Sequence, residues 1–293
     1  MSWRLLCIRW FTSVLQRICP RNGPQLHQPA VNKYYKEFRG YSEMFLPVRE
    51  IMNPMGYSNW KTYLDETFVR AFEAYYIPKT EGNQSAERFI QSQEALGFYL
   101  VGRVYGVYLT DYLPNREKYP TFKSFMLELA RLMGDWYGEG FWKNISPEPT
   151  IRIAFMAFKA DGVKVYAAQN LSESTYVKSY VEMLENAGFK VTFTDKLENG
   201  NLIVIAPLNS SVTCKLNRYV EIRGNSVVLN GVKYSNGVFL VEALRNPKGG
   251  FAMLIAGTPD VFEKKPSGGG DESLLNYHYF VYITSLKRAV AFG

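Results

Sequence analysis

One predicted helix carries the side chains in this sequence that are best suited to chemistry. In residues 60–76, WKTYLDETFVRAFEAYY, the charged residues Glu66, Arg70 and Glu73 recur at intervals of four and three. This spacing places them on one face of a helix. A carboxylate that a neighbouring guanidinium group holds in place can act as a metal ligand. The same residues can also form a solvated ion pair that contributes only about 0.3 kcal/mol, and the spacing alone leaves both interpretations open.

The other face of this helix is apolar, which predicts that it packs against a core. The apolar stripe consists of Leu64, Phe68, Phe72 and either Tyr75 or Tyr76. Pro78 is expected to end the helix. Further helices are predicted for residues 31–52, for residues 85–112, and from residue 122 to about Gly134, the last with Thr121 as its N-cap.

Four segments between about residues 30 and 145 carry a resemblance to a known family. They read VNKYYKEFRGYSEMF, GYSNWKTYLDETFVRA, EALGFYLV and LPNREKYPTFKSFMLELARL. In this order and at these spacings they resemble an uncharacterised family of prokaryotic proteins that is similar to zinc metallopeptidases of the gluzincin type. In that family an H-E-x-x-H helix lies some forty residues upstream, and the acidic residue before V-R-A is the third zinc ligand. The resemblance therefore implies that Glu66 is a metal ligand.

The resemblance also implies a cofactor and a substrate. In intact relatives, two histidines and the acidic residue hold zinc, and a peptide or protein is the substrate. This chain contains only two histidines, His27 and His278, and no H-E-x-x-H. A site of this class needs two histidines on one helix face and a glutamate that activates water. We therefore expect neither stoichiometric zinc nor peptide hydrolysis from this chain.

The place where the missing motif should lie is anomalous. Residues 20–29 read PRNGPQLHQP, and synonymous codons in the shifted reading frame permit HEMGHSFISP. Residues 1–29 also hold four arginines but no lysine and no acidic residue, unlike the rest of the chain. Our hypothesis is that this segment is a frameshifted or misassigned start.

Charge and hydropathy limit the partners that we expect. Without the four charges of residues 1–29, the net charge of +7 falls to +3, and no Lys/Arg run exceeds two residues. We therefore do not expect nucleic-acid binding. Arginines interrupt the apolar run of the first twenty residues, so no integral membrane span is expected, although an amphipathic basic helix stays possible. Cys214 is expected to be buried or half-buried.

The sequence pattern changes after Pro147 and Pro149. The apolar run at residues 151–158, IRIAFMAF, predicts a buried strand, and residues 163–168 predict another. A helix capped by Ser172 or Ser174 and ending at Gly188 follows, and then come several strands joined by glycine and asparagine turns. Together these elements predict an α/β layer that is at least partly parallel. The closing residues 277–290 predict one more strand, with His278 in a structural role.

The fold class that we predict is α+β. Residues 1–29 form the anomalous basic segment, residues 30–146 an all-helical peptidase-like domain, and residues 150–293 a smaller α/β accessory domain. The accessory domain resembles modules that accompany hydrolases in prokaryotic surface proteins. An extracellular or cell-surface location, with an export signal lost upstream, is the hypothesis that follows.

Two functions are compatible with this outline. The first is a relative of a gluzincin-type zinc metallopeptidase that is truncated and inactive. The alternative is a non-enzymatic module whose aromatic side chains bind a cell-surface polymer or a partner protein. The first requires Glu66 to lie in a cleft beside residues 20–29, whereas the second requires it to lie in solvent.

Overall fold

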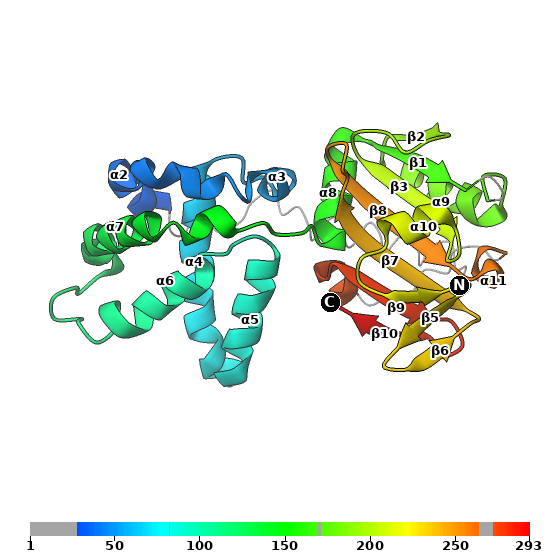
Figure 1. Ribbon diagram of the computed structural model, residues 1–293. Coiled ribbons are helices and arrows are strands. Elements are labelled where there is room, and N and C mark those ends of the chain that lie inside the picture. Colours follow the sequence, from blue (N-terminus) through cyan, green and yellow to red (C-terminus); the bar gives the residue numbers. More distant parts are fainter. Residues whose placement is uncertain (1–27, 82, 169–170, 264–271) are drawn as a thin grey trace. The chain divides into compact units, whose positions relative to one another are not determined.

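The computed structural model describes residues 28–81, 83–168, 171–263 and 272–293. It has mixed helix and sheet content, as the α+β prediction requires. The described residues fall into two compact units, a helical unit that ends at Pro147 and a sheet unit that begins at Glu148 (Figure 1). The sheet unit, which we expected to be the smaller, is the longer of the two. No helix within the described ranges is long and apolar enough to cross a membrane.

The described elements of the helical unit are all helices. They are α2 (Gln28–Phe38), η1 (Arg39–Phe45), α3 (Arg49–Met52), η2 (Asn53–Met55), α4 (Trp60–Glu81), α5 (Asn83–Ala95), α6 (Val101–Val107), the π-helical η3 (Tyr108–Tyr112), α7 (Phe122–Glu139) and η4 (Phe141–Asn144). Helix α4 contacts α2, α5 and α6 and is therefore the central element of the unit (Figure 1).

The core of this unit is aromatic. The ring of Tyr63 on α4 stacks on Phe98, with 5.5 Å between the ring centroids, and its hydroxyl donates to the carbonyl oxygen of Gly97 at 3.2 Å. Phe68 lies one turn further along α4 and meets Phe38 of α2 edge to face at 5.7 Å. Aromatic pairs of this geometry add specific attraction to the burial of apolar area. They fix which face of α4 points inward.

The predicted apolar stripe of α4 is correct at Leu64 and Phe68 but wrong at Phe72. Leu64 and Phe68 are fully buried, whereas Phe72 is 38% exposed. Successive steps of four residues advance by more than one helical turn, so such a row drifts around the helix and leaves the core face. Ala71 and Ala74 continue the buried face instead.

Several predicted helix boundaries are wrong. Helix α4 continues past Pro78 to Glu81. Helix α7 passes Gly134 and ends at Glu139, where Gly140 caps it with a φ of +72°. The predicted helix over residues 31–52 is divided into α2, η1 and α3. The predicted helix over residues 85–112 breaks at Gly97, whose φ of +100° no α-helix can accommodate. Thr121 is confirmed as an N-cap, because its Oγ1 accepts a hydrogen bond from the Ser124 amide at 3.2 Å.

The described residues of the sheet unit form two sheets. Its elements are α8 (Ile151–Asp161), β1 (Val163–Ala167), α9 (Thr175–Asn186), β2 (Val191–Thr194), β3 (Leu202–Pro207), α10 (Ser211–Leu216), β4 (Glu221–Arg223), β5 (Ser226–Leu229), β6 (Val232–Tyr234), β7 (Val238–Arg245), β8 (Phe251–Gly257), α11 (Pro259–Phe262), η5 (Glu272–Asn276), β9 (Tyr279–Ile283) and β10 (Arg288–Phe292). The larger sheet has the order β10-β9-β7-β8-β3-β1-β2, and the smaller has the order β4-β5-β6.

The prediction of a partly parallel layer is confirmed. Strands β2, β1, β3 and β8 are parallel neighbours, whereas β7, β9 and β10 add antiparallel pairs. Helix α9 begins after Ser174, whose side chain accepts from the Val177 amide, and Gly188 follows its end with a φ of +79°. The closing segment forms the two strands β9 and β10 and not one strand.

The predicted strand at residues 151–158 is wrong, because this segment forms helix α8. An unbroken apolar run has no period of its own, so it fits a buried helix as well as a buried strand. Thr150 caps the helix by accepting from the Ile153 amide, and Gly162 ends it with a φ of +83°. Helix α8 packs on β7 and β8. The prediction for Cys214 is also wrong, since this residue is exposed on the short helix α10.

The break at Gly97 gives a stability prediction. A Cβ atom at Gly97 would lie 2.5 Å from Cδ1 of Ile51 and 2.6 Å from Cε of Met52, two fully buried side chains. Together with the positive φ, this crowding should make Gly97→Ala lower the free energy of unfolding by about 2 kcal/mol. Gly106→Ala is the control, because Gly106 lies inside α6 with open space around the added atom. It should raise the stability by about 0.5 kcal/mol. Thermal unfolding that shifts both variants in the same direction would contradict this account of the turn.

Candidate functional site

Glu66 and Arg70 form an ion pair on α4. Nη2 of Arg70 lies 2.7 Å from Oε1 of Glu66, and the two side chains are 19% and 29% exposed. Four-residue spacing on a continuous helix brings them together, and Asn59 helps to start that helix by accepting a hydrogen bond from the Thr62 amide at 3.0 Å. Glu66 is therefore held against the helical unit and is not a freely solvated side chain.

Arg70 is fixed by residues from outside its own helix. Its guanidinium carbon lies 4.3 Å from the centroid of the Phe98 ring, and Nη1 donates to Oε1 of Gln93 on α5. Nη2 also reaches the hydroxyl of Tyr57 at 3.5 Å. A planar guanidinium group that stacks on a ring while it donates at its edge loses most of its rotational freedom. Arg70 thus connects Glu66 to α5 and to the segment after Gly97.

Two other acidic residues of α4, Asp65 and Glu73, interact electrostatically with this pair. Burial, followed by the charge of Glu66, raises the pKa of Asp65, although Lys61 opposes the shift. Burial also raises the pKa of Glu73, and the charge of Arg70 opposes that shift. Within the described residues, Oδ1 of Asp65 and Nε of Arg70 are buried without a hydrogen-bond partner. In this cluster Glu66 and Glu73 interact with the guanidinium group of Arg70, and Asp65 interacts with Glu66.

The donor set of this cluster does not fit zinc. Zinc in a catalytic site takes three protein ligands, usually including histidine nitrogens. Within the part of the chain that the structure describes, no group of three or more His, Cys, Asp or Glu side chains could hold a metal ion. Oε1 of Glu66 is already paired with Arg70. The cluster can orient one carboxylate but cannot by itself complete a zinc centre.

The described residues of the helical unit include no histidine. His278 belongs to the sheet unit, where its Nδ1 lies 3.1 Å from the carbonyl oxygen of Pro149 and its ring lies beside that of Tyr219. This position agrees with the structural role that we predicted for it. His27 and the frameshift hypothesis concern residues 1–29, of which residues 1–27 lie outside the described part of the chain.

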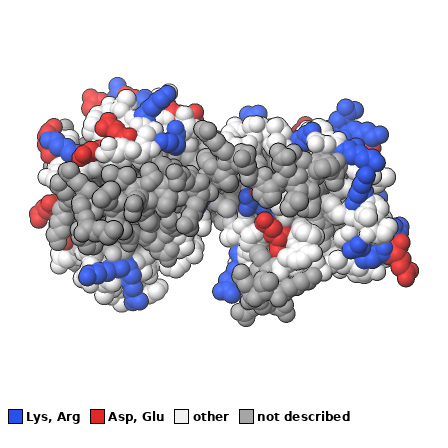
Figure 2. All heavy atoms as spheres, turned by 180° about the vertical axis from the view of Figure 1, so that it is seen from behind, with Lys and Arg blue, Asp and Glu red and all other residues white. Residues whose placement is uncertain are grey.

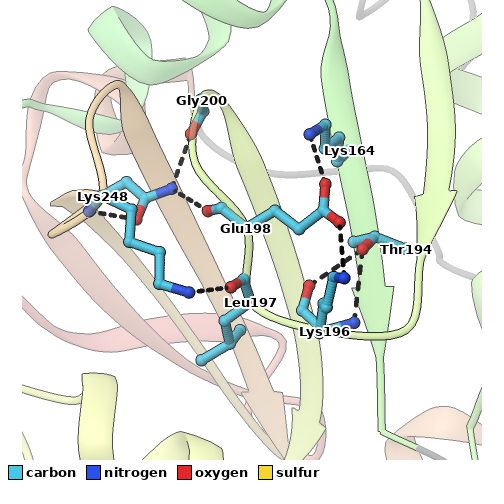
Figure 3. A network of polar contacts seen from close by, with 8 residues as sticks. Lys164, Thr194, Lys196, Leu197, Glu198, Gly200 and Lys248 are labelled. Carbon is cyan, nitrogen blue, oxygen red and sulfur yellow. Dashed lines mark hydrogen bonds and ion pairs between the residues drawn. The ribbon is translucent and has the colours of Figure 1, made fainter.

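A second polar cluster lies in the sheet unit, between β2 and β3 (Figure 3). It surrounds a hollow of about 430 Å³ that is lined by Lys196, Leu197, Glu198, Asn199 and Lys248. Lys164 donates to the carboxylate of Glu198, which lowers the pKa of Glu198, and Lys248 donates to the carbonyl oxygen of Leu197 at 2.8 Å. Because these lysines bind oxygens of the loop itself, we assign the cluster to fixing the loop between the two strands.

The charged surface is mixed. Figure 2 shows Lys and Arg side chains on both units with Asp and Glu side chains among them. Arg131 illustrates the pattern on α7, where it pairs with Glu128 and Asp135, each at 2.8 Å. On this part of α7 the positive charge is therefore paired with acidic side chains of the same helix.

Because Arg70 is fixed by several contacts, we expect its substitution to lower the stability more than the substitution of Arg131. Arg70→Met removes the ion pair, the stacking on Phe98 and the donor to Gln93, so the free energy of unfolding should fall by about 2 kcal/mol. Arg131→Met is the matched control, because Arg131 also pairs with carboxylates on its own helix but is more exposed. Its effect should be much smaller. Equal midpoints of chemical unfolding for the two variants would refute the proposed fixation.

No protein-family model, curated protein or solved structure matches this chain.

Proposed function

We propose that residues 30–146 are a helical domain derived from a gluzincin-type zinc metallopeptidase, and that residues 150–293 are its α/β accessory domain. In intact relatives the zinc ion activates a water molecule that attacks a peptide carbonyl. In this chain Glu66 occupies the position of the acidic ligand, but the pair of zinc-binding histidines is missing. The chain therefore does not hydrolyse peptides.

The observation that carries this proposal is the fixation of Glu66 through Arg70. Metal ligands are usually oriented by a second set of contacts, and a carboxylate held by a stacked guanidinium group has this property. Glu66 and Arg70 are also the acidic residue and the arginine of the E-T-F-V-R-A segment on which the resemblance rests.

Contacts within and beyond the E-T-F-V-R-A segment also support the proposal. Ala71 has no exposed surface, so the position after Arg70 allows close packing of α4. Arg70 itself reaches Phe98, which belongs to the EALGFYLV segment of the same resemblance. Two of the four segments that resemble the family are thus joined by one side-chain contact, which supports reading them as parts of one site.

One observation favours the alternative, a binding module. Phe72 and Tyr76 lie one turn apart on α4, are 38% and 49% exposed, and have ring centroids 4.7 Å apart. Partly exposed aromatic pairs provide large contact areas for polymers and protein partners. In this alternative Glu66 has no special role.

The alternative has its own test. If the chain binds a cell-surface polymer through these rings, the full chain should co-sediment with isolated cell walls, and Phe72→Ser combined with Tyr76→Ser should abolish that retention. Leu127→Ser, which changes another exposed apolar residue of the same unit, is the control. Retention that survives the double substitution would exclude this surface.

The peptidase proposal predicts the result of restoring the missing motif. The full chain in excess zinc should retain almost no metal and should not cleave generic peptides. A variant in which residues 20–29 are replaced by HEMGHSFISP should bind about one zinc ion per chain, because two histidines then join Glu66. Metal content after gel filtration measures this directly.

Two further variants make the result specific for Glu66. In the restored chain, Glu66→Gln should weaken zinc binding at least about tenfold, because a neutral amide is a poor zinc ligand. Glu73→Gln, on the same helix, should leave zinc binding unchanged. A restored chain that binds no zinc, or that binds it equally well after Glu66→Gln, would overturn the proposal.

A further inference from the structure

A buried carboxylate in the sheet unit, distant in the sequence from the proposed site, carries a further inference. Glu242 lies near the middle of β7, and its side chain has no exposed surface. It is in register with Leu254 on β8 and with Tyr279 on β9. Its neighbours on the same face of β7, Leu240 and Leu244, belong to the apolar core. A glutamate at such a position is rare and needs compensation.

The compensation comes from one loop, residues 217–220, which joins α10 to β4. Oε2 of Glu242 accepts a hydrogen bond from the backbone amide of Arg218 at 3.2 Å, and the amide of Tyr219 contributes as well. The loop is closed by its own contacts, since Asn217 Nδ2 donates to the carbonyl oxygen of Val220 at 2.7 Å and its Oδ1 accepts from the Val220 amide. Glu242 therefore attaches a preformed loop to the sheet.

The two oxygens of Glu242 are in different environments. Oε2 accepts the backbone hydrogen bonds, whereas Oε1 is buried without a partner among the described residues. This asymmetry fits a neutral carboxyl group, in which one oxygen accepts and the other carries the proton. An ionised group would leave half of its charge on an unsolvated oxygen, which is costly in an apolar environment.

The charged and titratable groups around Glu242 do little to stabilise its ionised form. Arg218 is the nearby cation, but its Nη1 lies 3.2 Å from Oε1 of Glu148 and so pairs with that carboxylate. The centroid of the Tyr219 ring lies 5.0 Å from that of Tyr279 and 6.4 Å from that of His278, and both pairs are stacked. The Tyr219 hydroxyl is buried without a partner, as is Oε2 of Glu148. Burial and the charges of Glu148 and Glu242 raise the pKa of Tyr219, so this hydroxyl stays neutral.

We propose that Glu242 is a proton-controlled latch, whose neutral carboxyl group holds the loop of residues 217–220 on the sheet and whose ionised form releases it. The loop leads into the three-stranded sheet β4-β5-β6. Leu216, just before the loop, and Val220, its last residue, are part of the apolar core. Release therefore loosens the attachment of the smaller sheet. The latch is independent of the proposed peptidase ancestry.

The pH range of the latch follows from the linkage of protonation to opening. Burial raises the pKa of Glu242 from 4.5 to about 7, against the opposing effect of the Arg218 and Tyr219 amides. In the open loop, water restores the ordinary value. The closed state is therefore fully favoured below about pH 4.5, loses its advantage as the pH rises, and loses no more above about pH 7.

Amide hydrogen exchange on the full chain tests the latch. After correction for intrinsic rates, the protection of the Arg218 and Tyr219 amides should fall about 50-fold between pH 5 and pH 8. Glu242→Gln keeps a neutral hydrogen-bonding group, so it should abolish this pH dependence and retain the protection. Glu221→Gln is the control, because Glu221 lies just beyond the loop and pairs with Arg223 at the surface. It should leave the pH dependence unchanged.

Two results would overturn the latch. One is equal protection of these amides at both pH values in the unmodified chain, and the other is a pH dependence that Glu242→Gln does not alter. A carboxyl carbon NMR titration of the unmodified chain gives a measurement that requires no variant. A midpoint for Glu242 near pH 7 supports the latch, and a midpoint near pH 4.5 refutes it.

Discussion

The turn at Gly97 is the constraint on which the helical unit and its candidate site depend. A φ of +100° ends α5 and turns the chain so that Phe98 stacks on Tyr63 and lies against Arg70. The same turn presents the carbonyl oxygen of Gly97 to the Tyr63 hydroxyl. One backbone conformation thus serves the aromatic core of α4 on one side and the fixation of a charged pair on the other. A continuous helix over this region could not place Phe98 in both contacts.

The two units compensate buried charge in different ways. In the helical unit, Arg70 has a full counter-charge, Glu66, and its planar group is further held by a ring and an amide side chain. In the sheet unit, Glu242 has only backbone amides and an arginine that pairs with another carboxylate. A buried carboxylate without a dedicated cation avoids the cost of desolvating its charge by becoming neutral. The first arrangement suits the orientation of a ligand, and the second suits a response to pH.

The peptidase ancestry that we propose would account for the anomalous first segment. Glu66, in the segment E-T-F-V-R-A, pairs with Arg70 but has no partner ligands with which it could hold a metal within the described residues. The stretch in which such a partner belongs is the one whose composition departs from the rest of the chain and whose shifted frame permits H-E-M-G-H. The fixation of Glu66 would persist after the loss of the histidines, because Arg70 and Phe98 also contribute to the packing of α4.

The sequence by itself determined the features that depend on short-range spacing. The contact of Glu66 with Arg70 follows from their separation by one helical turn, and the caps at Thr121 and Ser174 follow from local hydrogen bonding. The sequence also shows that its two histidines, His27 and His278, do not form an H-E-x-x-H motif. Only the tertiary structure decided that residues 151–158 are helical and that Cys214 is exposed. It also decided that Phe98 and Gln93 contact Arg70 and that Glu242 is buried. The physical reason is that spacing encodes which face a side chain shares with its neighbours along the chain. Burial, in contrast, depends on which distant elements cover that face, and this is set only when the whole core packs.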